Sequence, residues 1–159
     1  MDIFQLMDAR DTTLAQKLAL LFGGVFLVAG IAGFIPGITT NLYDGLELAG
    51  NDGDAELLGL FKVSVLHNIV HALFGVGILA AKRHVSSLQY LLYAGVIYVV
   101  LFVLGLFGGG DWVPINDADD WLHLVLALGL LGGWAVARGV PDPERKRGRL
   151  EMERDEPRV

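Results

Sequence analysis

The sequence predicts an all-α fold, an integral membrane four-helix transmembrane bundle, from two observations. The first is composition, because 53% of the 159 residues are hydrophobic and only 19% are charged, too few to cover a soluble domain of this size. The second is spacing, because four apolar segments each approach the about 20 residues that a helix needs to cross a bilayer. The segments are Leu18–Ile35, Leu57–Ala81, Leu88–Phe107 and Trp121–Ala137. Since lipid offers the backbone no hydrogen-bond partners, continuous apolar runs of this kind are helical.

The distribution of positive charge predicts how these helices are oriented. The two long loops, 36–56 and 108–120, contain acidic residues but no Lys or Arg. Of the 12 basic residues, all but Lys62 lie in the N-terminal arm, in the short link at Lys82-Arg83 or in the tail. Basic residues that flank membrane helices stay on the cytoplasmic side. The sequence therefore predicts a multi-pass protein of the plasma (inner) membrane, with both termini cytoplasmic and two acidic outer loops.

Three parts follow one another along the chain. They are an N-terminal arm at the cytoplasmic surface (1–17), the transmembrane domain (18–137) and a charged cytoplasmic tail (138–159). The arm is expected to lie on the inner interface as a short helix or to fray, and Thr12 or Thr13 can cap the first helix. Pro36-Gly37 ends that helix, because proline cannot continue one. The tail is rich in Pro, Glu, Arg and Asp, so it is expected to be disordered.

Several classes of function are excluded by what the sequence contains. The absence of cysteine rules out disulfides, thiolate metal sites and cysteine nucleophiles. The sequence has no nucleophile elbow, Walker sequence or zinc-protease helix, so it is not expected to be an enzyme of those classes. Membrane orientation explains the basic residues, and no nucleic-acid partner is expected. The remaining partners are the lipid bilayer, other membrane protein subunits or a second copy of the chain.

A polar cluster is predicted in the outer half of the bundle. Its members are Ser64, His67, Asn68, His71, Asp120 and His123. At about 100° per residue, the first four share one face of the second helix, and the last two lie at a similar depth on the fourth. Polar groups are costly in hydrocarbon, so this face is expected to point into the bundle and is a candidate functional site. By contrast, His84 is expected to be solvated at the cytoplasmic surface.

The cluster is open to three interpretations. Hydrogen bonds from Asn68 to His123 and from Asp120 to His71 would simply hold the helices together. Alternatively, His67, His71 and His123 could ligate zinc or copper with Asp120 orienting one ring, or two of the histidines could ligate haem. In the third interpretation the cluster lines the outer vestibule of a small transporter or channel. The sequence does not identify a cofactor.

The two halves of the chain resemble each other. Asn68 is followed by His71 and then by Gly77, and Asp120 is followed at the same spacing by His123 and Gly129. Duplication of a two-helix hairpin, giving a parallel repeat, accounts for this pattern.

Three segments also carry a family resemblance. They are residues 33–41 (GFIPGITTN), 57–77 (LLGLFKVSVLHNIVHALFGVG) and 116–123 (NDADDWLH). With them, the chain resembles domain-of-unknown-function family 4383, a group of small bacterial four-helix membrane proteins, over roughly Leu18–Ala137. The resemblance implies a four-span bundle and brings no activity, cofactor or catalytic residue. With glycine-rich helix faces and little room for an independent transport pathway, the chain is expected to be a non-enzymatic accessory or assembly subunit of a membrane complex.

Overall fold

The computed structural model describes residues 12–50, 52–107, 114, 116–143, 145, 149 and 152, and within them the fold is mostly helical. Three helices are long and apolar enough to cross a membrane: α1 (Leu14–Ala32), α5 (His84–Leu106) and α6 (Asp117–Ala137). They correspond to the first, third and fourth apolar segments of the sequence. The predictions made for residues 1–11 of the arm and for most of the tail fall outside the described residues.

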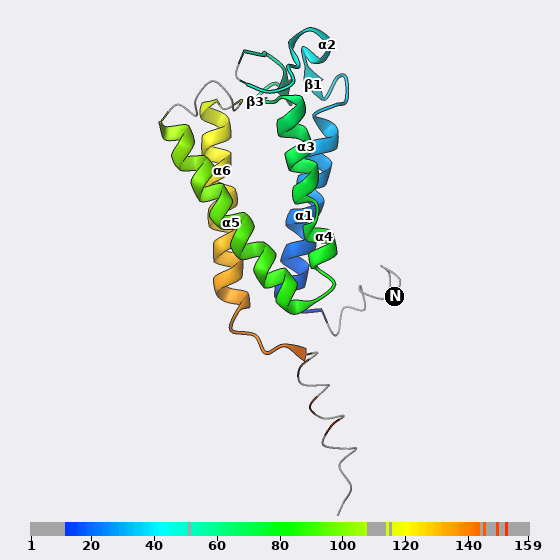
Figure 1. Ribbon diagram of the computed structural model, residues 1–159, viewed down its shortest axis with the longest axis vertical. Helices are drawn as coiled ribbons and strands as arrows, with labels where there is room; N and C mark the ends of the chain where they lie inside the picture. Colours follow the sequence, from blue (N-terminus) through cyan, green and yellow to red (C-terminus); the bar gives the residue numbers. More distant parts are fainter. Residues whose placement is uncertain are drawn as a thin grey trace, which may run out of the picture.

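The second apolar segment folds differently from the prediction. Its helical part is shorter and has two pieces, α3 (Val65–Phe74) and α4 (Gly77–Ala80), which form one column beside α1 (Figure 1). The predicted helix start at Leu57 is wrong, because α3 begins only after Ser64. The Ser64 Oγ accepts a hydrogen bond from the His67 N–H at 3.1 Å and so satisfies one of the free amides at the start of the helix.

A small antiparallel sheet occupies the outer loop between α1 and α3, so the prediction of an all-α fold is corrected here. The elements of this loop are β1 (Thr39–Thr40), the single-turn helix α2 (Leu42–Gly45), β2 (Glu56–Leu57) and β3 (Phe61–Lys62). The strands lie in the order β1-β2-β3. Leu58 and Gly59, with φ of 58° and 67°, form the left-handed turn between β2 and β3. Short apolar runs suit strands and helices equally, so hydropathy alone does not separate the two.

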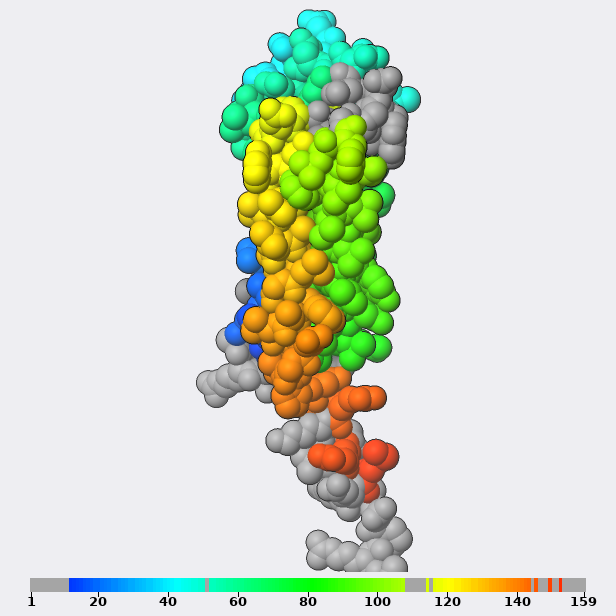
Figure 2. Space-filling view, turned by 90° about the vertical axis from the view of Figure 1, so that its left-hand side faces the viewer, coloured from blue at the N-terminus to red at the C-terminus, as the bar shows by residue number. Residues whose placement is uncertain are grey.

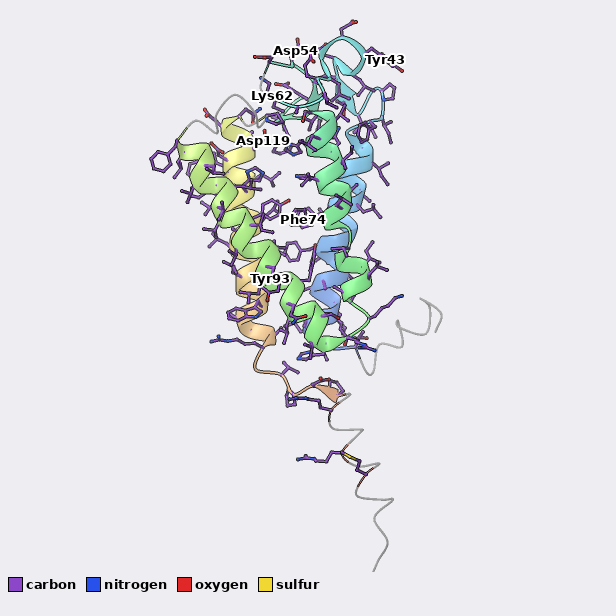
Figure 3. The ribbon with its side chains drawn as sticks, in the orientation of Figure 1. Tyr43, Asp54, Lys62, Phe74, Tyr93 and Asp119 are labelled. Atoms are coloured by element: carbon purple, nitrogen blue, oxygen red, sulfur yellow. The ribbon has the colours of Figure 1, made fainter. Side chains whose placement is uncertain are left out.

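One carboxylate ties this sheet to the last helix. The Asp119 Oδ2 accepts hydrogen bonds from the backbone N–H of Lys62 in β3, at 3.1 Å, and from that of Asn116, at 3.2 Å. Asn116 in turn accepts from the Asp119 N–H, which completes the capping box at the start of α6. Figure 3 shows Lys62 and Asp119 close together where the loop meets α6.

Helices α1, α3 and α4 form one antiparallel hairpin, and α5 and α6 form a second. Helix α1 packs against α3 and α4, and α5 packs against α6 side by side (Figures 1 and 2). Because α1 also contacts both α5 and α6, it joins the two hairpins. Helix α3 makes few contacts with α5. This leaves a side of the bundle where the hairpins are less tightly closed.

Equivalent residues recur in the two hairpins and extend the repeat seen in the sequence. Ser64 and Asn116 are the N-caps of α3 and α6. In each hairpin two glycines at equivalent positions in or just after the first helix face the second helix at close range. The pairs are Gly23 with Gly77-Ile78 and Gly33 with Asn68 in one hairpin, and Gly95 with Leu130-Leu131 and Gly105 with Asp120 in the other. The same small residues therefore allow the same close approach of two helices in both halves.

The repeat also places equivalent aromatic residues at the centre of the molecule. Phe26 of α1 and Tyr98 of α5 are both buried and stack on each other, with ring centroids 5.2 Å apart and planes 7° apart. Phe74 of α3 packs edge-on against both rings, at 5.5 Å from each. The three rings form an aromatic layer that holds the two hairpins together.

The inner end of the bundle carries a buried chain of hydrogen bonds. His84 is only 3% exposed, so the expectation that it is solvated is wrong. The Thr13 hydroxyl donates to the Gln16 Oε1 at 3.0 Å, so it must accept from the His84 Nδ1 at 2.9 Å. The Gln16 Nε2 donates to the Ala81 carbonyl at 3.1 Å. These bonds connect the start of α1, which Thr13 caps as predicted, to the turn between α4 and α5.

Candidate functional site

A pocket of about 160 Å³ lies between the two hairpins, at the end of the bundle that carries the sheet. Helix α3 forms one wall of this pocket, and residues of α5 and α6 form the other. Leu66 and Val70 lie at its edge, and their side chains are 50% and 38% exposed. The pocket therefore opens sideways, between α3 and α5, onto the apolar surface of the molecule.

Two histidines of α3 form the polar side of the pocket, and the sequence predicted their shared face. The Nε2 atoms of His67 and His71 are 3.0 Å apart, and the rings stack with centroids 4.5 Å apart. A hydrogen bond between two imidazole nitrogens requires that one carries the hydrogen and the other a lone pair. At least one ring is therefore uncharged, and His67 also hydrogen-bonds to the backbone of Pro114. Ser64, which also lines the pocket, fixes the first turn of α3 beneath this pair.

His123 reaches the same pocket from α6. Its side chain is 3% exposed and packs against Tyr98, with ring centroids 5.4 Å apart. Its buried Nδ1 has no hydrogen-bond partner within the described residues. Leaving such an atom unpaired costs about 1–3 kcal/mol, which a bound molecule with a matching hydrogen-bonding group would offset. His123 therefore brings an unsatisfied polar group to the residues that line the pocket.

The two other predicted members of the polar cluster do not reach the histidines. Asn68 is 1% exposed and lies against Gly33 of α1, and Asp120 lies against Gly105 of α5. The Nδ2 of Asn68 and the Oδ1 of Asp120 have no partner among the described residues. The predicted hydrogen bonds from Asn68 to His123 and from Asp120 to His71 are therefore not formed. Asp120 also does not orient a histidine ring, because it points toward α5 within its own hairpin.

The structure does not form the three-histidine metal site that the sequence suggested. In the part of the chain that the structure describes, no group of three or more His, Cys, Asp or Glu side chains is arranged to hold a metal ion. His67 and His71 pair with each other, whereas His123 lines the same pocket and packs on Tyr98. The pocket is also smaller than the about 300–1,000 Å³ typical of sites that enclose a drug-sized ligand. A haem macrocycle, for which two histidines were considered, does not fit inside it.

The aromatic layer closes the pocket on its inner side. Phe74 and Tyr98 belong both to this layer and to the pocket wall. Figure 3 shows Phe74 between the two columns of helices. His71 packs edge-on against Phe26, with centroids 5.9 Å apart, so the histidine pair rests directly on the layer. The histidine side chains that line the pocket therefore lie next to the rings of the aromatic layer.

An apolar groove of about 420 Å³ continues from the pocket along the same opening between the hairpins. Val70 and Phe74 line both spaces. Further along, Val76 just before α4 and Tyr93 of α5 line the groove, and it extends to Ala80 near the inner end of the bundle. Pocket and groove together thus form one elongated space with polar groups at one end.

Sequence reasoning missed four residues of this region. Tyr98 and Phe74 were treated as ordinary apolar residues of their helices, and nothing in their spacing marks them as a pocket wall. Pro114, which lines the pocket from the loop before α6, corresponds to Pro36 in the other half, so the repeat could have indicated it. Asp119 was overlooked in favour of its neighbour Asp120. A one-residue step turns a side chain by about 100° on a helix, so pattern alone did not settle which acid is buried.

Comparison with known proteins gives one match. The family model described as Domain of unknown function (DUF4383) matches residues 16–136, which include α3, α4, α5, most of α1 and α6, and the residues that line the pocket. No curated protein and no solved structure matches the chain significantly.

Proposed function

Because the chain belongs to the DUF4383 family, whose function is unknown, we propose a function from the geometry: it is a non-enzymatic accessory protein of the plasma membrane that holds a small molecule taken from the bilayer. The observation that carries this proposal is the pocket between the hairpins. It opens sideways onto an apolar surface, and its lining includes His123, whose buried Nδ1 has no partner among the described residues. A larger membrane complex would use the molecule that this subunit holds.

Four crossings with both termini in the cytoplasm put the pocket in the outer leaflet. Helical residues 65–80 span about 24 Å at 1.5 Å per residue, somewhat less than the ~30 Å hydrocarbon layer. The Ser64 cap and the outer sheet then lie at the level of the headgroups, where Lys62 and the loop acids meet water. The distribution of basic residues supports this orientation, since 11 of the 12 fall at the opposite end.

The chemistry of the pocket supports binding more than catalysis or transport. Among the described residues that line it, none is an Asp, Glu, Lys or Arg. His67 and His71 are engaged with each other, and the rings of the aromatic layer fill the centre of the bundle beside the pocket. A transport pathway would require that layer to open, and a metal site would require His123 to move toward the pair. Neither alternative is favoured by a specific contact.

Mass spectrometry of the protein released directly from native membranes tests the proposal. We expect the wild-type chain to carry a stoichiometric small molecule. Val70→Trp, which fills the mouth of the pocket, should lose it. Leu128→Trp is the matched control, because Leu128 is 65% exposed on α6 and lines none of the spaces described. A wild-type protein that carries no more than Val70→Trp does would refute the binding role.

A further inference from the structure

We infer that the molecule held between the hairpins is a lipid with a flat, uncharged head that carries carbonyl or hydroxyl oxygens and with one apolar chain, the chemistry of a prenylated quinone. This inference rests on the proposed function and names the class of ligand for the same site. Three features carry it: the polar groups of the pocket, the aromatic rings around it, and the groove that leads away from it.

The hydrogen-bonding groups of the pocket fit an uncharged head. His67, His71 and His123 all line the pocket, and the buried Nδ1 of His123 has no partner among the described residues. Imidazoles offer single N–H donors and single lone pairs, which suit carbonyl and hydroxyl oxygens. The described lining has no Lys or Arg to balance a carboxylate or phosphate and no acid to balance an amine. A charged head would therefore lose its hydration without gaining a counter-charge.

The walls of the pocket fit a head that is flat. Three of the lining residues carry rings that pack in a row, Phe74 on Tyr98 and Tyr98 on His123, and the stacked rings of His67 and His71 line the pocket beside them. Aromatic faces and edges pack best against another ring. A volume of about 160 Å³ is too small for a whole lipid, so the pocket takes the head alone.

The groove fits a single chain. Its lining is almost entirely apolar and begins at Val70 and Phe74, where the pocket ends. It runs along α3, α4 and α5 toward the inner end of the bundle, as the chain of a lipid does when its head lies in the outer leaflet. Two acyl chains would have to separate around Phe74, which projects between the columns (Figure 3).

Binding of decylubiquinone and of its chainless head, 2,3-dimethoxy-5-methyl-1,4-benzoquinone, to the full chain in phosphatidylcholine nanodiscs tests the assignment. The chain has no cysteine, so quinones have no thiol to react with. We expect one decylubiquinone per chain. His123→Phe keeps the packing on Tyr98 but removes the nitrogens, and it should weaken both compounds about tenfold, the effect of one lost hydrogen bond. Should this variant not fold, His67→Phe at the same pocket takes its place, with the same expected loss.

A second pair of variants tests the chain and groove separately from the head. Val76→Trp blocks the groove and should weaken decylubiquinone while leaving the chainless head unaffected. Leu79→Trp, at a similarly exposed position of α4 that does not line the groove, should change neither. Equal effects of the two tryptophans would refute the placement of the chain.

The remaining outcomes separate this inference from the proposed function. Displacement of decylubiquinone by oleate as effectively as by the chainless quinone would refute the uncharged head. Absence of quinone binding, in a protein that still carries another molecule from native membranes, would overturn the assignment and leave the binding role standing. Only the loss of both would remove the proposed function as well.

Discussion

Two adjacent glycines of α1 allow a sharp test of how the first hairpin packs. A Cβ added at Gly23 would lie 2.6 Å from the backbone N of Ile78 and 2.8 Å from the carbonyl carbon of Gly77. Backbone atoms cannot turn aside as a side chain can, so the helices must separate. Overpacking of this kind costs about 1–3 kcal/mol. At 1.4 kcal/mol per factor of ten, Gly23→Ala should reduce the folding equilibrium constant by roughly five- to 150-fold.

Gly24→Ala provides the control for this prediction. A Cβ at Gly24 meets nothing within 4 Å, so the substitution adds only the helix preference of alanine, at most about 0.5–1 kcal/mol in favour of folding. Reversible unfolding of both variants in mixed micelles, titrated with a denaturing detergent, gives the two free energies. Equal stabilities for Gly23→Ala and Gly24→Ala would show that α1 and α4 do not meet at this point, and the packing described here would be wrong.

Three further predictions follow from individual contacts. Thr13→Val removes the hydroxyl that both caps α1 and continues the inner chain of hydrogen bonds, and should cost about 1–2 kcal/mol of unfolding free energy in the same titration. Asp119→Ala removes the acceptor for the Lys62 N–H of β3, so amide hydrogen exchange at residues 56–62 should accelerate. Asp117→Ala, at an exposed neighbouring position, is the control. Equal exchange rates in the two variants would contradict this role of Asp119. Phe26→Ala opens the aromatic layer and should lower the free energy of unfolding by about 3–5 kcal/mol. Val28→Ala is the control and should change it little, because the Val28 side chain is 67% exposed. A loss of stability in Val28→Ala alone would show that the core lies elsewhere.

Much of the fold follows from hydropathy and charge, because both act over whole segments. Three long apolar helices and the Thr13 cap were predictable, whereas α1 ends at Ala32, three residues before the predicted end at Ile35. The repeat was visible in the sequence at only a few positions, since packing preserves size and polarity at a position more than residue identity. Phe26 and Tyr98 illustrate this, because they are equivalent and stacked but chemically different.

The errors have a common physical origin: composition does not distinguish between local environments of similar polarity. Residues 57–63 are as apolar as the helix that follows them, yet they form strands, and Gly59 and Ser64 were the local signals of a turn and a helix start. For the site, helical spacing correctly placed His67 beside His71. It did not show that Asn68 packs on a glycine, because the rotation of a helix relative to its neighbours is set by tertiary packing.

The position of the pocket in the outer leaflet depends on how the chain crosses the membrane, and single-cysteine labelling measures this directly. The natural chain has no cysteine, so Tyr43→Cys, Val85→Cys and Gly139→Cys each introduce one reactive thiol at an exposed position without changing the basic residues. With a membrane-impermeant maleimide on intact cells, Tyr43→Cys should be labelled at once, and the other two only after permeabilisation. Labelling of Val85→Cys from outside would mean that α3 and α4 do not complete a crossing, and the pocket would no longer face the outer leaflet.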